Sequence, residues 1–362
     1  MRATHPIVLA AAAAIVTAAI ATTAFADRGG PGPIEATSFT AVFKSPLGLE
    51  GLTGDEDGNL YSTGRNASPC PVYRVAATGG PAVVVGNVPA PCSPSGIAFG
   101  PDGRLYLSDD DQILAVAPDA AAPPTASVYA NGVPGTNGLA FDRNDDLWTG
   151  DGTTGQGRIW RVDQHGVVTE AFRVQPLVNG VGVGREARTL PPGTAQPLVA
   201  NGVAFDRDGS LLVADTARGA LWRVALDRAG NPLSPTGCDS TFTANTLCLD
   251  NIWVQHPYLE GSDGIALDRA GNVWAAANER NAIVVVRKQG ETTEVFRNPA
   301  DDATSLRNGG PLEFPTSPFL LDRTLCVTSS DGNRRDNSPN TAGEVRPGSA
   351  AVAKISCAPL RR

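Results

Sequence analysis

The chain has 362 residues and a formal net charge of −8 at pH 7. An acidic chain lacks the basic patches that nucleic-acid binding needs, so this class of function is disfavoured. Glycine and proline are abundant, with 40 and 29 residues, and long apolar stretches of helical period are absent. Short apolar runs between turn residues predict an all-β protein instead.

The first 26 residues are typical of a secretory signal. An arginine at position 2 is followed by an apolar run and by "AFA" before Asp27, which predicts cleavage after Ala26. A retained membrane anchor is the alternative. Residues 27–35 are rich in glycine and proline and predict a flexible arm. No later apolar run is long enough to cross a membrane, so we expect a secreted, periplasmic or extracellular protein.

Six copies of one repeat follow in chain order. Each copy has a short apolar strand, a turn of the D-x-x-G kind, a second strand that usually carries an aromatic residue, and a third strand such as "RIWRVD". A fourth strand often follows. The copies begin at Glu50, Ser95, Asn137, Asn201, Asp263 and Thr316. Four antiparallel strands repeated six times predict a six-bladed β-propeller over residues 36–362.

The last copy has no room for a fourth strand after residues 350–356, whereas the segment "TSFTAVFKS", residues 37–45, stands unpaired before the first copy. We therefore expect this N-terminal strand to complete the last blade and leave no open edge. Extra residues in the third and fourth copies, such as "SPTGCDSTFTANTLC", predict loop insertions.

The six cysteines form no C-x-x-C pair, so a zinc site is disfavoured. An even number behind a signal predicts disulfides in an oxidising compartment, although six cysteines allow 15 pairings. Cys326 and Cys357 fall on the second and third strands of one predicted blade, so we expect them to pair. As neighbours in the sequence, Cys70 and Cys92 form the second expected pair, and Cys238 and Cys248 the third.

The first residue of each repeat varies, although the body of the repeat stays constant. Innermost propeller strands line the central axis, so these six head residues should form a ring. All offer oxygen: two are carboxylates, Glu50 and Asp263, and two are amides, Asn137 and Asn201. Such oxygens are the ligands that Ca²⁺ prefers, and no His or Cys lies in the ring. Alternatively, the heads only cap strands and satisfy backbone groups.

The heads "LEG", "TNG", "ANG" and "SDG", in blades one, three, four and five, resemble the senescence marker protein / gluconolactonase / luciferin-regenerating-enzyme-like family of six-bladed calcium-dependent hydrolases. The resemblance implies that Glu50, Asn201 and Asp263 bind a divalent metal, most simply Ca²⁺. It places Asn137 beside the metal or the substrate and makes Asp263 the general base or nucleophile. The metal would polarise a lactone carbonyl.

Two motifs depart from the family pattern. The first blade reads "EGLTGD" where the family continues Glu-Gly-Pro, and the third reads "PGTNG" without the Arg that usually precedes the Asn. The metal ligands match, but the sugar-lactone pocket does not, so the resemblance leaves the substrate open.

His256, in "WVQHPYLEGSDG", lies on the approach to Asp263 and is a candidate substrate-binding residue, although a loop histidine before proline is often only solvent-exposed. We expect a monomeric hydrolase of lactones or related esters that acts on a small molecule. The alternative is a non-catalytic propeller that binds a sugar, peptide or cell-wall component, since propellers host many functions. A metal-free propeller of the strictosidine-synthase kind is disfavoured by the Glu50–Asp263 pair.

Overall fold

The structure is a computed structural model that describes residues 31–176, 199–300, 307, 310–330 and 353–360. The predicted signal, and the predicted arm up to residue 30, lie outside the described residues, as does most of the insertion in the third copy. Within the described residues, no helix is long and apolar enough to cross a membrane.

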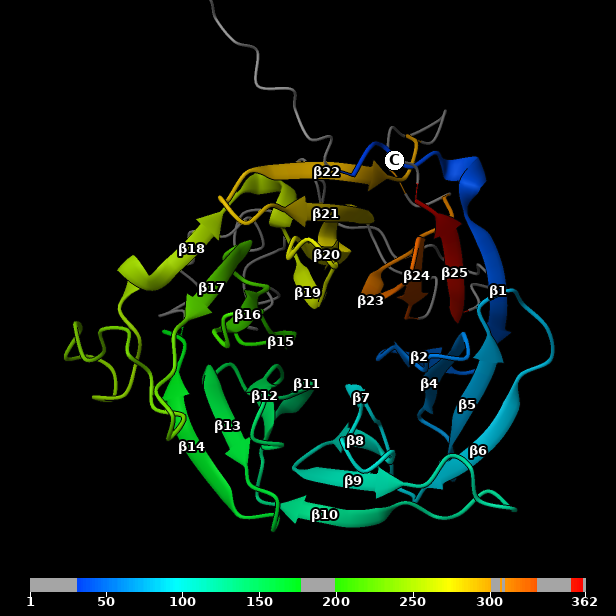
Figure 1. Ribbon diagram of the computed structural model, residues 1–362, viewed down its shortest axis with the longest axis horizontal. Coiled ribbons are helices and arrows are strands. Elements are labelled where there is room, and N and C mark those ends of the chain that lie inside the picture. Colours follow the sequence, from blue (N-terminus) through cyan, green and yellow to red (C-terminus); the bar gives the residue numbers. More distant parts are fainter. Residues whose placement is uncertain (1–30, 177–198, 301–306, 308–309, 331–352, 361–362) are drawn as a thin grey trace, which may run out of the picture. The chain divides into compact units, whose positions relative to one another are not determined.

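The described residues after Gly30 form six antiparallel sheets arranged as blades around a central axis (Figure 1). The innermost strand of each blade contacts the innermost strands of both neighbouring blades, all the way round the ring. The predicted six-bladed β-propeller is therefore confirmed.

The strands of each blade follow the repeat. Blade one contains β2 (Gly48–Leu49), β3 (Thr53–Gly54), β4 (Asn59–Arg65), β5 (Cys70–Ala76) and β6 (Val83–Val88). Blade two contains β7 (Ile97–Phe99), β8 (Leu105–Asp109), β9 (Gln112–Val116) and β10 (Ser127–Asn131). Blade three contains β11 (Thr136–Phe141), β12 (Leu147–Asp151), β13 (Arg158–Val162) and β14 (Val168–Arg173).

The second half of the ring has the same order. Blade four contains β15 (Val203–Phe205), β16 (Leu211–Asp215), β17 (Ala220–Val224) and β18 (Ile252–Gln255). Blade five contains β19 (Ser262–Leu267), β20 (Val273–Ala277), β21 (Ala282–Val286) and β22 (Thr292–Arg297). Blade six contains β23 (Pro315–Leu321), β24 (Thr324–Ser329), β25 (Ala353–Pro359) and β1 (Thr40–Ser45). Single-turn 3₁₀ helices occur at η1 (Ala36–Ser38), η2 (Leu249–Asn251), η3 (Pro257–Leu259) and η4 (Asn278–Arg280).

The closure of the ring is as predicted. Strand β1 pairs antiparallel with β25 and supplies the outermost strand of blade six. Cys326 and Cys357 lie directly opposite each other on β24 and β25 and form a disulfide with Cα atoms 4.1 Å apart. The pairs Cys70–Cys92 and Cys238–Cys248 are also bonded, so all three predicted disulfides are confirmed.

The D-x-x-G turns hold the first two strands of a blade together. In blade five the Asp268 carboxylate accepts hydrogen bonds from the backbone N–H of Ala270 and Asn272 and from the indole N–H of Trp274. Gly271 in this turn has φ +84°, a conformation that glycine adopts at little cost.

The hydrophobic core is divided into six clusters, and each cluster lies between two neighbouring blades. The largest side chains in it, Trp148, Trp222 and Trp274, are fully buried on the second and third strands. Because each blade packs on both neighbours through similar residues, the body of the repeat stays constant along the chain.

Glycine follows the head residue in five of the six copies, and the ring explains why. A Cβ on Gly138 would lie 2.9 Å from the carbonyl oxygen of Asn201 in the next blade, and one on Gly264 would lie 2.5 Å from that of Thr316. The innermost strands therefore meet backbone to backbone, which brings the head residues close to the axis.

Candidate functional site

Three of the heads, Asn137, Asp263 and Glu50, lie where the pairing of the innermost strand is irregular. In blade three, Asn137 and Gly138 fall in a register shift between β11 and β12, and in blade five Asp263 and Gly264 fall in the equivalent shift. Glu50 lies in the gap between β2 and β3. Such bulges redirect a side chain out of the regular alternation. Here they allow the heads to face the axis.

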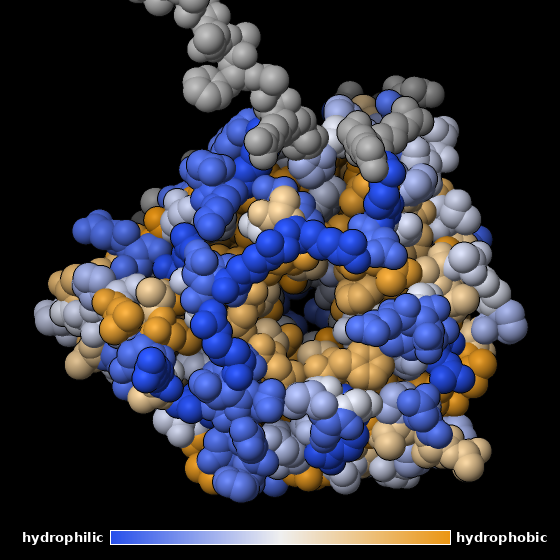
Figure 2. Space-filling view, viewed as in Figure 1, coloured by the Kyte–Doolittle hydropathy of each residue, from blue (hydrophilic) through white to orange (hydrophobic). Residues whose placement is uncertain are grey.

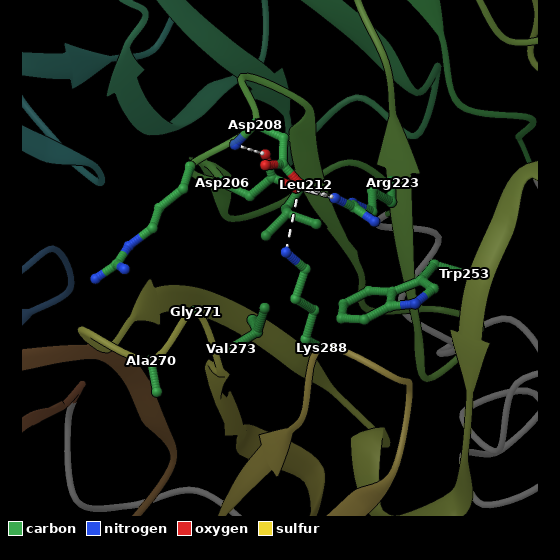
Figure 3. A pocket seen from close by; sticks show the side chains of 10 residues that line it. Asp206, Asp208, Leu212, Arg223, Trp253, Ala270, Gly271, Val273 and Lys288 are labelled. Atoms are coloured by element: carbon green, nitrogen blue, oxygen red, sulfur yellow. Dashed lines mark hydrogen bonds and ion pairs between the residues drawn. The ribbon is translucent and has the colours of Figure 1, made fainter.

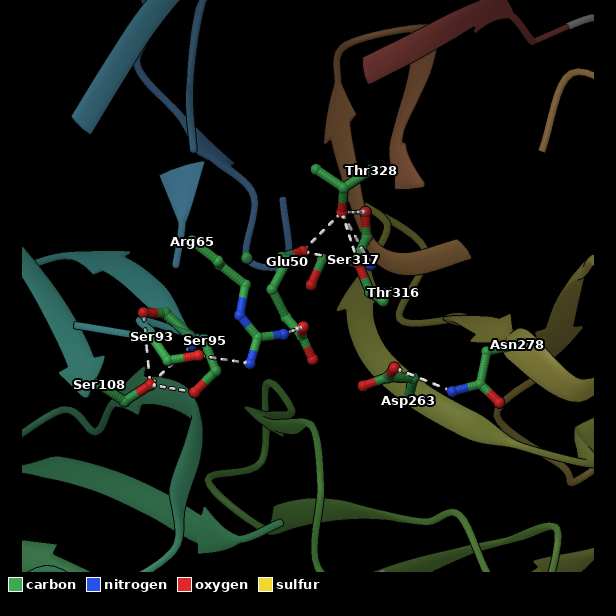
Figure 4. A network of polar contacts seen from close by, with 12 residues as sticks. Glu50, Arg65, Ser93, Ser95, Ser108, Asp263, Asn278, Thr316, Ser317 and Thr328 are labelled. Atoms are coloured by element: carbon green, nitrogen blue, oxygen red, sulfur yellow. Dashed lines mark hydrogen bonds and ion pairs between the residues drawn. The ribbon is translucent and has the colours of Figure 1, made fainter. Parts of the chain in front are cut away.

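The heads converge on a cavity of about 60 Å³ at the axis, lined by Asn137, Asn201 and Asp263 and by the glycines that follow the heads. In Figure 4 the carboxylates of Glu50 and Asp263 point toward the same central space. Figure 2 shows the hollow at the centre of the ring, surrounded by apolar residues on this face. The structure thus brings Asn137, Asn201 and Asp263 together at the cavity, as the repeat alignment predicted, whereas Glu50 points toward the same space but is not among the residues that line the cavity.

A second set of residues supports the heads. In blades one to five it is the residue 15 positions after the head, and in blade six, where this stretch is one residue shorter, it is the residue 14 positions after the head; the six are Arg65, Asp110, Gly152, Thr216, Asn278 and Ser330. Three of them hold the head of their own blade: Arg65 pairs with Glu50, Thr216 with Asn201, and Asn278 with Asp263. These residues were not predicted from the sequence. This slot varies along the repeat as the heads do, which is the signal that would have found it.

The side-chain amide of Asn201 is buried, with a hydrogen bond from its nitrogen and none to its oxygen among the described residues. Its side chain is 2% exposed, and its Nδ2 donates to Thr216 Oγ1 at 3.1 Å. Its Oδ1 is buried and has no hydrogen-bond partner among the described residues. Native structures seldom leave a buried polar atom unpaired, so this oxygen is a candidate ligand atom.

Asp263 is a buried carboxylate with 4% of its surface exposed. Its Oδ2 accepts a hydrogen bond of 3.0 Å from Asn278 Nδ2. Burial raises the pKa of Asp263 well above its usual value, and the negative charge of Glu50 raises it further, against the opposing effects of Asn278 and Arg65. When both carboxylates are ionised, Glu50 and Asp263 carry two negative charges against the one positive charge of Arg65.

Glu50 is the second carboxylate of the site, and its Oε2 forms an ion pair with Arg65 (Figure 4). The same guanidinium donates from its other terminal nitrogen to Ser93 Oγ at 3.0 Å. The ion pair was not predicted, because it depends on how β4 ends beside the gap in the innermost strand of blade one.

The remaining predicted residues take different positions. Asn137 lines the cavity and is 7% exposed, and a Cβ on Gly152 would lie 2.7 Å from its Nδ2. His256 does not line the cavity. It precedes η3, its Nδ1 accepts a hydrogen bond from the backbone N–H of Tyr258, and its ring packs edge-on against the Tyr258 ring.

The site fits a hard cation by its donor chemistry. The carboxylate of Asp263 lines a small cavity together with the Asn201 amide oxygen that has no partner among the described residues. The Glu50 carboxylate points toward the same space, and Ca²⁺ takes such oxygen ligands. Nowhere in the described chain do three or more His, Cys, Asp or Glu side chains cluster to hold a metal. Any ion at the axis would thus depend on the amide of Asn201 as well as on the carboxylates.

Two larger cavities lie among the turns at the far end of the innermost strands. One, of about 110 Å³, is lined by Trp253, Leu212 and charged side chains from blades four and five (Figure 3). There Asp208 already pairs with Arg223 at 3.0 Å and lies 3.7 Å from Lys288. The other, of about 270 Å³, lies between the turns of blades three and four. Among the described residues that line these two cavities, no buried side-chain oxygen lacks a hydrogen-bond partner as Asn201 Oδ1 does.

Residues 186–330 match the model of the SMP-30/Gluconolactonase/LRE-like region. The match includes the heads Asn201 and Asp263, and the resemblance to this family predicted from the repeat heads is confirmed. No curated protein matches the chain at the sequence level.

Solved structures share the fold. The chain is similar to a calcium-binding protein, regucalcin, from Agrobacterium tumefaciens, with 19% identity, a TM-score of 0.57, and 91% of this chain and 94% of that one covered. It is similar to a gluconolactonase from Xanthomonas campestris, with 14% identity, a TM-score of 0.57 and 92% and 96% covered. A PQQ-bound aldose sugar dehydrogenase from Streptomyces coelicolor has 16% identity, a TM-score of 0.56 and 89% and 97% covered. At these identities the likeness establishes the fold alone.

Proposed function

We propose that this protein is a secreted, metal-dependent hydrolase of lactones or related esters, with a divalent cation, Ca²⁺, held at the propeller axis by Glu50, Asn201 and Asp263. The observation that carries the proposal is the buried Oδ1 of Asn201, which has no hydrogen-bond partner among the described residues and lies beside the buried carboxylate of Asp263. The pKa of Asp263 is raised by burial and by Glu50. A site with excess negative charge and a free oxygen is suited to a cation.

When bound, such a cation supplies Lewis-acid polarisation of a carbonyl oxygen. The residues of the chain supply the rest. Asn278 holds Oδ2 of Asp263, so that the other carboxylate oxygen can accept a proton from the water that attacks the ester carbon. Asn137 lines the same cavity and can donate a hydrogen bond from Nδ2 to the substrate.

The substrate class rests on the family match and the gluconolactonase-like fold, and we propose it for this chain on that basis. Gluconolactone itself is a weaker candidate, because "EGLTGD" and "PGTNG" depart from the family motifs. The same fold in a sugar dehydrogenase shows that the site, and not the fold, must decide the reaction. The signal-like start and three disulfides support secretion.

The test is a hydrolysis screen of the purified protein over aliphatic lactones and aryl esters, with CaCl₂ and after removal of metal with EGTA. We expect turnover that needs Ca²⁺ and that Asp263→Ala removes together with Ca²⁺ binding. Asp268→Ala is the matched control, because it removes a carboxylate from the same blade roughly 16 Å away along β19. Turnover that survives Asp263→Ala would contradict the proposal. No turnover at all, with Ca²⁺ still bound, would favour the non-catalytic binding protein.

A further inference from the structure

We propose that Arg65 is a built-in counter-cation that competes with the divalent cation for Glu50 and so sets the cation concentration at which the axial site fills. This inference rests on the proposed function, since it concerns the same site. It goes beyond that function by naming the residue that controls its loading.

The guanidinium of Arg65 is held in place by two contacts, one of them with Glu50. One terminal nitrogen pairs with Glu50 Oε2 and the other donates to Ser93 Oγ at 3.0 Å. Ser93 is itself fixed, because its backbone N–H donates to the buried carboxylate of Asp109 at 2.7 Å. The Arg65 Nε is buried without a partner among the described residues. The arginine thus has two anchors, of which Glu50 is the charged one.

The equivalent residues of the other chemically active blades are neutral. Thr216 holds Asn201, Asn278 holds Asp263, and Gly152 lies against Asn137 without a side chain. Of the four support residues Arg65, Gly152, Thr216 and Asn278, only Arg65 in blade one places a positive charge against the head residue of its blade. That cation faces one of the two carboxylates that a divalent ion would need.

The two cations therefore compete for the carboxylate of Glu50. A divalent ion that takes Glu50 as a ligand must share or break a charge-assisted hydrogen bond, which is stronger than a neutral one. The side chain of Arg65 is 26% exposed and that of Glu50 14% exposed, so the arginine has a route to solvent when it is released. The pair lowers the affinity of the site for the ion but does not close it.

The experiment measures Ca²⁺ binding by isothermal titration calorimetry on the full-length secreted protein after EGTA treatment. We expect Arg65→Met to lower the Kd for Ca²⁺ at least tenfold, because Glu50 is then free to act as a ligand. Arg65→Lys should lie between wild type and Arg65→Met, since lysine keeps the charge but loses the planar fork that reaches both Glu50 and Ser93. If Arg65→Met does not fold, the Kd of Arg65→Lys for Ca²⁺ still tests the inference.

Arg158→Met is the matched control. Arg158 pairs with Asp151 at 3.2 Å, at the same end of the strands in blade three, so its loss removes an equal charge without freeing Glu50. We expect a change in Kd of less than threefold. Asp263→Asn should remove binding in every background.

The outcomes separate this inference from the proposed function. If Asp263→Asn removes Ca²⁺ binding but both Arg65 variants keep the wild-type Kd within twofold, Arg65 does not compete and only this inference is wrong. An equal gain in Arg65→Met and Arg158→Met would mean a general charge effect and would also overturn it. If neither wild type nor Arg65→Met binds Ca²⁺, the axial metal site itself is refuted.

Discussion

The sharpest test of the axial site is the isosteric substitution Asp263→Asn, because it should change the metal-free and the Ca²⁺-bound protein in opposite directions. Without metal, the folded protein holds a buried carboxylate whose pKa is raised by burial and by Glu50. The amide of asparagine has no charge to desolvate and can still accept the hydrogen bond from Asn278 Nδ2. We expect the metal-free variant to be more stable than wild type by about 1–3 kcal/mol at pH 8.

With Ca²⁺ the order should reverse. A ligand at a hundred times its Kd stabilises the folded state by about 2.7 kcal/mol. The unit from Pro31 to Arg362 has about 330 residues, and its unfolding entropy at about 2.1 cal/mol/K per residue gives about 0.7 kcal/mol/K. The Tm of wild type should therefore rise by about 4 °C on saturation, and that of Asp263→Asn should not move.

Differential scanning calorimetry at pH 8, with EGTA and with CaCl₂, measures both changes. Asp268→Asn is the control, since it weakens a turn of the same blade and should lower the Tm while the rise with Ca²⁺ remains. A Ca²⁺-induced rise that Asp263→Asn retains in full would refute the reasoning, as would a metal-free variant less stable than wild type at this pH.

Further expectations concern the other residues of the site and the closure of the ring. Asn137→Ala should lower turnover more than Ca²⁺ occupancy, because Asn137 lines the cavity without a required ligand atom; steady-state kinetics beside calorimetric titration measure the two. His256→Ala should change the kcat/KM little, because His256 lies outside the cavity lining, and a tenfold loss would show that it reaches the substrate. Because folding raises the pKa of Asp263, the contribution of this carboxyl group to the stability of the folded state is complete below the usual carboxyl pKa of 3.8. The contribution is lost as the pH rises through the raised pKa of the folded state. The advantage of Asp263→Asn over metal-free wild type should thus be absent at pH 3.5 and grow toward pH 8 in thermal scans. Replacing Cys326 and Cys357 together by alanine should lower the free energy of unfolding in urea by about 2–4 kcal/mol, since the bond joins residues 31 apart; no change would mean that the pairing of β24 and β25 already fixes this loop.

The repeat was enough to predict the fold because every copy carries the same turn and strand residues. It also predicted the ring of Glu50, Asn137, Asn201 and Asp263, since equivalent positions of a propeller meet at the axis. The supports of these heads were not predicted. Arg65 lies 15 residues beyond Glu50, and only the register of β4 shows that it ends beside the gap that holds Glu50.

His256 shows the opposite case. It lies seven residues before Asp263 in the sequence, which made it a candidate for the mouth of the site. Its Nδ1 accepts the backbone N–H of Tyr258, and its ring rests on the Tyr258 ring, away from the residues that line the cavity. Nearness along the chain does not fix direction where a turn such as η3 intervenes.

Blade six takes strands from both sides of the chain, because β1 ends at Ser45 and β25 begins at Ala353. While the polypeptide emerges from a ribosome, β1 has no partner strand until β25 has been made, and only then can the ring close. The axial cavity depends on heads from blades one, three, four and five being held at fixed separations. A chain that lacks β25 could fold some of its blades, but its ring would stay open, so any chemistry at the axis requires β25 to be in place.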